Sequence, residues 1–178
     1  MKKGQKEAFL IKYYNELKEL NYYKENSFYW LQYSIACMNI GKYDLAQTYL
    51  DNAYSWFRDS EEIVPFQIDT QQAKLNLTVI EKGGAVDIKG KFLEAHDLLM
   101  KPVVSVKDNP VKQITNFKYY MKKGVKDKMI KEGYIKEYQK CCGEAYNKTN
   151  QYLKNVLVEA DKRELQNLAQ NLLRNSVG

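Results

Sequence analysis

Residues 29–54 read YWLQYSIACMNIGKYDLAQTYLDNAY, and this stretch decides the fold of the chain. Bulky residues recur at helical spacing before Gly41, and alanines recur at helical spacing after it. Glycine readily adopts the left-handed conformation that ends a helix, so Gly41 predicts a turn between two helices. The stretch holds almost no side chain suited to catalysis. It therefore predicts a helical hairpin, with one helix over residues 28–39 and a second over residues 43–58.

Three small residues predict that these two helices pack closely. Ser34 allows the partner helix to approach, and Ala46 and Ala53 share one face of the second helix, where only a methyl group fits. Trp30 is the first large side chain that fills the space between the two helices, and Tyr43 packs just after the turn. The aromatic residues are therefore assigned to packing rather than to ligand binding.

The rest of the chain is also helical in its spacing and shows no strand-like alternation. Either Asn26 or Ser27 can cap the helix that follows, and Asp87 can cap a later one. We expect further helices over residues 6–20, 65–82, 87–99, 111–123 and 162–173. Gly124 is expected to end or kink the helix over 111–123. A long helix between the last two has a heptad stripe formed by Ile135, Tyr138, Cys142, Ala145, Thr149, Tyr152 and Val156. The predicted fold class is all-α.

The spacing of the opening stretch resembles the tetratricopeptide repeat. The matching positions are Trp30, Ser34, Gly41, Tyr43, Ala46 and Ala53. A second, degenerate hairpin has Ala73 as its small residue and Phe92 and Ala95 in the later positions, at an interval longer than the standard repeat of about 34 residues. The resemblance implies antiparallel hairpins stacked as a short tetratricopeptide-like α-solenoid with a long C-terminal helical cap. Residues 1–178 are expected to form one domain, with hairpins over 1–100 and a basic linker and C-terminal helices over 101–178.

Longer stretches resemble a more specific group of proteins. These are FYWLQYSIACMNIGKYDLAQTYLDNAYSW (residues 28–56), FQIDTQQAKLNL (66–77) and NPVKQITNFKYY (109–120). They are similar to the C-terminal region of prokaryotic multidomain proteins in which a P-loop NTPase or a sirtuin-like NAD-hydrolysing domain comes first, many of them linked to anti-phage defence. The resemblance implies a sensing or assembly region. The chain has no Gly-rich phosphate loop with Lys and Ser or Thr, so the catalytic half of those proteins is missing.

The positive charge is concentrated in one part of the chain. The net charge is +6, and residues 101–140, with eleven lysines and four acidic residues, contribute +7. This concentration is expected of a surface that binds an anionic partner, and equally of a solvated helix face. Nucleic-acid binding is therefore an alternative function. Its candidate residues are Lys118, Lys122, Lys123, Lys126, Lys128 and Lys131.

The sequence offers few residues for chemistry. His96 is the only histidine, and the cysteines Cys37, Cys141 and Cys142 match no metal-ligand spacing. We expect no enzyme activity, no metal and no cofactor. The N-terminal stretch is too charged for a signal peptide, and no apolar run is long enough to cross a membrane. A cytoplasmic location is therefore expected.

The main functional prediction is a non-catalytic scaffold or sensor module that binds a protein partner. Repeat geometry assigns the binding groove to Phe28, Leu31, Ile35, Met38, Asn39, Gln67, Gln71 and Lys74. The alternative is that these residues pack against neighbouring helices. The resemblance to defence proteins implies an NTPase, nuclease or NADase effector, or a phage component, as the partner.

Overall fold

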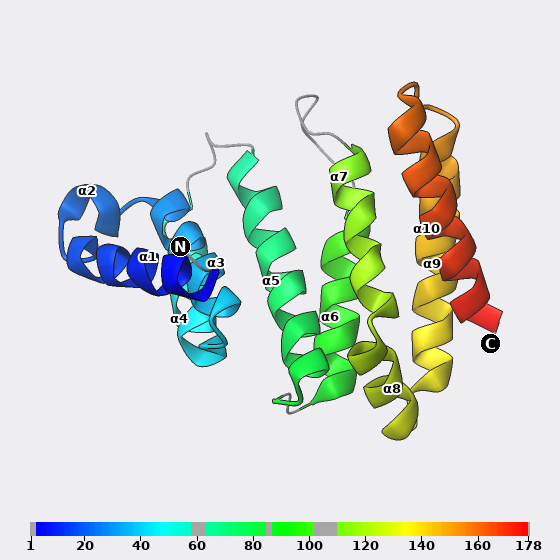
Figure 1. The fold of residues 1–178 in the computed structure, drawn as a ribbon, viewed down its shortest axis with the longest axis horizontal. Coiled ribbons are helices and arrows are strands. Elements are labelled where there is room, and N and C mark those ends of the chain that lie inside the picture. The colour runs from blue at the N-terminus through cyan, green and yellow to red at the C-terminus, as the bar shows by residue number, and fades with distance from the viewer. Residues whose placement is uncertain (1–2, 58–62, 85–86, 102–109, 178) are drawn as a thin grey trace. The chain divides into compact units, whose positions relative to one another are not determined.

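The computed structural model describes residues 3–57, 63–84, 87–101 and 110–177, and every regular element in these ranges is helical (Figure 1). The predicted all-α class is confirmed, and the helices pack in pairs. Contacts gather the chain into two compact units, residues 1–75 (unit 1) and 76–178 (unit 2). The border between them lies inside one long helix, whereas the sequence placed the change from hairpins to terminal helices at residue 100. Tetratricopeptide-like stacking of the pairs stays a prediction.

Unit 1 is built around the hairpin predicted from residues 29–54. Its elements are α1 (Lys3–Leu17), α2 (Asn21–Lys24), α3 (Ser27–Asn39), α4 (Tyr43–Ser55) and the first part of α5 (Ile63–Lys82). The Asn26 side chain caps α3 by accepting from the amides of Phe28 and Tyr29. Gly41 makes the predicted turn with a φ of 83°. The short helix α2 lies in a stretch that the sequence did not predict to be helical.

Two serine hydroxyls join the backbones of α3 and α4, which lie side by side in Figure 1. Ser34 Oγ donates to the Ala46 carbonyl at 2.7 Å, and Ser27 Oγ donates to the Ala53 carbonyl at 2.7 Å. A serine side chain is short, so these bonds form only where two backbones approach closely. The predicted close approach at Ser34, Ala46 and Ala53 is confirmed, because all three are buried.

An aromatic cluster (Tyr14, Tyr29, Trp30, Tyr33, Tyr49) fills the rest of this interface. The Tyr33 and Tyr49 rings stack with centroids 3.9 Å apart. Trp30 stacks on both of them and donates from Nε1 to the Lys24 carbonyl at 2.6 Å. The Tyr29 hydroxyl donates to the Tyr14 carbonyl in α1. The cluster therefore ties α1 and α3 to α4 without a ligand.

Unit 2 contains the second part of α5 and the remaining helices. They are α6 (Ile88–Met100), α7 (Pro110–Ile114), the 3₁₀ helix η1 (Thr115–Met121), α8 (Lys123–Lys131), α9 (Ile135–Leu153) and α10 (Glu159–Val177). Asp87 caps α6, as predicted, by accepting from the Gly90 amide. The prediction of a single α-helix over residues 111–123 is wrong, because the chain changes to the tighter 3₁₀ geometry at Thr115.

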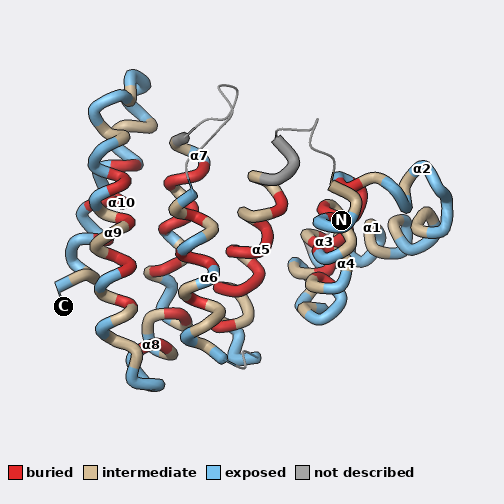
Figure 2. The backbone as a smooth tube through the Cα atoms, turned by 180° about the vertical axis from the view of Figure 1, so that it is seen from behind, coloured by how far each residue is buried: buried red, intermediate tan, exposed pale blue. Residues whose placement is uncertain are grey.

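The heptad stripe of α9 is confirmed over its middle part. Tyr138, Cys142, Ala145 and Thr149 are buried, and Figure 2 shows this buried stripe along α9 with exposed residues on its other side. The α10 helix packs against α9 through Leu165, Leu168, Ala169 and Leu172, and is longer than predicted. Val156 lies beyond the end of α9, so the stripe does not extend that far.

The α8 helix crosses the C-terminal end of α5 at Gly124. The sequence predicts that a helix ends or kinks at Gly124. In the structure the break lies at Lys122, between η1 and α8, and Gly124 is the second residue of α8. A Cβ atom on Gly124 would lie 2.8 Å from the Glu81 carbonyl oxygen and 2.8 Å from Glu81 Cγ. The missing side chain therefore allows the contact between the two helices.

Replacing Gly124 with alanine should lower the free energy of unfolding by about 1–3 kcal/mol, because the backbone at Glu81 must move to make room. The matched control is Gly143→Ala in α9, where the new Cβ would lie 3.8 Å from Ser176 Cβ, an ordinary contact. Gly143→Ala should be neutral or stabilising by up to about 1 kcal/mol, because alanine favours helix. Urea denaturation followed by circular dichroism measures both. Equal stabilities for the two variants would contradict the close contact at Gly124.

Candidate functional site

The predicted partner-binding residues of α3 divide into exposed and buried positions. Phe28 is 48% exposed, Asn39 is exposed, and Ile35 and Met38 are half-buried. Leu31 is 2% exposed and packs inside unit 1. This agrees with the alternative prediction, in which it packs against neighbouring helices and does not bind a partner. Part of the predicted surface is therefore core.

The predicted residues of α5 show the same division. Gln67 and Lys74 are half-buried, but Gln71 is buried. The Gln71 Nε2 donates to Ser34 Oγ at 3.4 Å and to Met38 Sδ at 3.6 Å, so its amide is used within unit 1. The sequence missed a reciprocal amide pair between Gln47 of α4 and Gln72 of α5, with N–O distances of 2.9 and 2.8 Å.

The six candidate lysines lie in η1, α8 and the residue between them. Lys122 Nζ lies 3.3 Å from Glu81 Oε2, and the Lys128 ammonium lies next to Gly83, so both are near the C-terminal end of α5. Cations are favourable there because of the helix dipole. Lys118, Lys122, Lys123 and Lys131 are exposed, and Lys126 and Lys128 are half-buried. The lysines are thus only partly a solvent-facing group.

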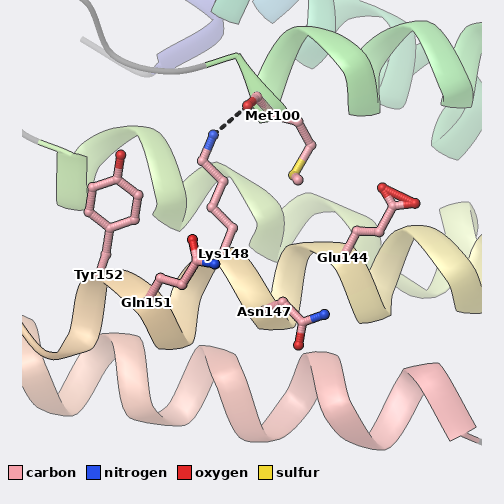
Figure 3. Close-up of a pocket in the computed structure, with 6 residues that line it drawn as sticks. All are labelled: Met100, Glu144, Asn147, Lys148, Gln151 and Tyr152. Carbon is pink, nitrogen blue, oxygen red and sulfur yellow. Dashed lines mark hydrogen bonds between the residues drawn. The ribbon is translucent and has the colours of Figure 1, made fainter.

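A cavity of about 410 Å³ lies against α9 in unit 2 (Figure 3). We call it the α9 cavity. The described residues that line it are Met100, Glu144, Asn147, Lys148, Gln151 and Tyr152. One face of α9 supplies two opposite charges, two amides and a phenol to this cavity, and Met100 comes from the end of α6. No earlier prediction pointed to it.

The Glu144 carboxylate is connected to a buried chain of hydrogen bonds. His96 Nε2 lies 3.2 Å from Glu144 Oε2, and His96 Nδ1 lies 2.8 Å from the Tyr120 hydroxyl. All three groups are satisfied if Tyr120 donates to Nδ1 and Nε2–H donates to Glu144. Burial raises the pKa of Tyr120 well above its usual value, so its hydroxyl keeps the proton that this pattern needs. The Tyr138 hydroxyl in turn donates to the Tyr120 carbonyl at 2.8 Å.

The Lys148 ammonium is held at the C-terminal end of α6. Lys148 is 9% exposed, and Nζ donates to the carbonyls of Met100 at 2.5 Å and Lys101 at 3.2 Å. Burial lowers the pKa of Lys148. Gln113 Nε2 donates to the same Lys101 carbonyl at 2.7 Å and to the Leu99 carbonyl at 3.4 Å. These two side chains therefore cap carbonyls that the helix itself leaves unpaired.

A second, more apolar hollow of about 300 Å³ lies where α9 turns into α10. We call it the α9–α10 groove. Its described lining residues are Val111, Tyr152, Asn155, Val156, Leu157, Val158 and Asp161. Leu157 is 92% exposed and Val158 is 59% exposed. The sequence could have indicated this surface, because three consecutive apolar residues (156–158) lie between two helices.

The cysteines do not form a reactive site. Cys37, Cys141 and Cys142 are buried. Burial raises the pKa of Cys142 to about 11 and that of Cys141 to about 12, and a raised pKa keeps a thiol protonated and unreactive at neutral pH. Within the described ranges, no three His, Cys, Asp or Glu side chains are placed to hold a metal ion. None of the described helices has the length and apolarity needed to cross a membrane.

The chain was compared with protein-family models, curated proteins and solved structures, and none of them matches it.

Proposed function

We propose that this chain is a non-catalytic helical module that binds a protein partner, and that the α9–α10 groove takes part in the binding. The proposal rests on one observation, the exposure of Leu157 and Val158 beside an apolar groove. Exposed aliphatic side chains next to one another are typical of protein-interaction sites, because covering them removes apolar surface from water. The groove offers a partner both protruding side chains and a hollow to fill.

Apolar residues on unit 1 provide further support. Phe28 is 48% exposed and lies on the same helix as the half-buried Ile35 and Met38. Phenylalanine and methionine are enriched in protein interfaces relative to the rest of the surface. An NTPase, nuclease or NADase effector, or a phage component, is supported as the partner only by the resemblance of residues 28–56 and 66–77.

The chain's one histidine is used inside unit 2. His96 is buried, and both of its ring nitrogens are used in hydrogen bonds inside unit 2. A general base must reach a substrate proton, which this imidazole does not.

A photo-crosslinking amino acid at Leu157 should attach a partner protein in cells that express the chain. The same amino acid at Val177, which is 77% exposed near the C-terminal end of α10, is the matched control. With the attached protein purified, Leu157→Asp should weaken its binding at least about tenfold, because a carboxylate would be desolvated in the interface, and Val177→Asp should not. A calorimetric titration measures both variants. The absence of any protein attached at 157 and not at 177 would contradict the proposal, and so would unchanged binding by Leu157→Asp.

Nucleic-acid binding is the second candidate function, because two lysines and an aromatic ring lie together in the basic segment. The ammonium groups of Lys118 and Lys122 lie 5.6 and 5.0 Å from the centroid of the Tyr119 ring. A ring on which a base can stack, next to cations for the phosphates, is the arrangement found in proteins that bind single strands.

Changing Lys118, Lys122, Lys123 and Lys131 together to glutamine should then flatten the salt dependence of binding to a single-stranded oligonucleotide. Each lost phosphate contact reduces the slope of log K against log salt by about 0.7. Changing Lys6, Lys12, Lys18 and Lys24 to glutamine removes equal charge elsewhere and is the control. Fluorescence anisotropy over a series of salt concentrations gives the slopes. Equal slopes for the two variants, or no binding at low salt, would rule out this second function.

A further inference from the structure

Two opposite charges on α9 are kept apart although their spacing favours an ion pair. Glu144 and Lys148 are four residues apart, with Glu on the N-terminal side, which is the better arrangement for a helical salt bridge. In the described part of the chain, Glu144 instead accepts from His96, and Lys148 donates to the Met100 and Lys101 carbonyls. Both groups line the α9 cavity.

The position of Lys148 leaves a buried charge without a carboxylate partner among the residues that the structure describes. An ammonium group has three N–H donors, and the described residues supply two acceptors, both carbonyls. One N–H donor of this buried ammonium is therefore left for a further acceptor, and a carboxylate oxygen that accepts from it would also balance its charge.

Both charges line the α9 cavity, at different places along α9. In Figure 3, both side chains extend from α9 on the side of Met100: Lys148 reaches the Met100 carbonyl, and Glu144 lies on the other side of the Met100 side chain. A simple anion at Lys148 would be repelled by Glu144, and a simple cation at Glu144 would be repelled by Lys148. A molecule with both charges would satisfy both groups.

We propose that the α9 cavity binds a small zwitterion of the amino-acid type, with its carboxylate at Lys148 and its ammonium group at Glu144. The amides of Asn147 and Gln151 and the Tyr152 phenol supply hydrogen-bonding groups for the rest of the molecule. At about 410 Å³, the cavity has the size of a small-molecule site. This site is separate from the apolar surface proposed for a protein partner, apart from the shared Tyr152.

The test is calorimetric titration of the intact chain with each of the proteinogenic L-amino acids and with glycylglycine. At least one should bind, and its N-acetyl and methyl-ester forms should each bind at least about tenfold more weakly, because each form lacks one charge. Inorganic phosphate should bind more weakly than the zwitterion. No binding by any zwitterion, or phosphate binding as tightly, would overturn the proposal.

Glu144→Gln is the decisive variant. It keeps an oxygen acceptor for His96 and removes only the charge, so the fold should be retained, which circular dichroism checks. It should weaken binding of the amino acid at least about tenfold. The control is Lys140→Met, which removes an exposed charge one turn earlier on α9 and should leave binding unchanged. Unchanged binding by a folded Glu144→Gln variant would overturn the proposal.

Discussion

The structure depends on side chains of one helix that bind backbone carbonyls of another. Ser34 and Ser27 bind carbonyls of α4 in unit 1, and Asn76 Nδ2 of α5 binds the Lys91 carbonyl of α6 in unit 2 at 3.1 Å. The same kind of bond is made by Tyr138 to η1 and by Lys148 to the end of α6. Each such bond joins two helices at a set distance, and loss of the donor would leave a carbonyl of the other helix without that partner.

This bonding also shapes the surfaces proposed to be functional. The Lys148 side chain reaches the α6 carbonyls only by turning away from Glu144, and this turn leaves two charges facing one cavity. The apolar groove nearby forms where α9 ends and the chain turns into α10, which exposes Leu157 and Val158. The carbonyl bonds of Lys148 in the C-terminal half of α9 and the turn that follows this helix therefore account for both candidate sites.

Features set by neighbouring residues could be predicted from the sequence. The Asn26 and Asp87 caps, the turn at Gly41 and the pairing of Ser34 with Ala46 depend on residues close together in the chain. The change to 3₁₀ geometry at Thr115 could not be predicted, because the sequence has the same spacing there as in an α-helix. The buried position of Lys148 could not be predicted either. Lysine is usually exposed, and its acceptors, Met100 and Lys101, lie far away in the sequence.

The most direct test of the structural account is the stability of a Ser27→Ala, Ser34→Ala double variant. Both tryptophans, Trp30 and Trp56, lie in unit 1, so their fluorescence during urea unfolding follows this unit. Loss of two buried hydrogen bonds should lower the free energy of unfolding by about 1–3 kcal/mol, while Ser55→Ala, at an exposed position in α4, should change it by less than about 0.5 kcal/mol. A double variant as stable as Ser55→Ala would contradict the account, because the serine bonds would then not hold α3 and α4 together.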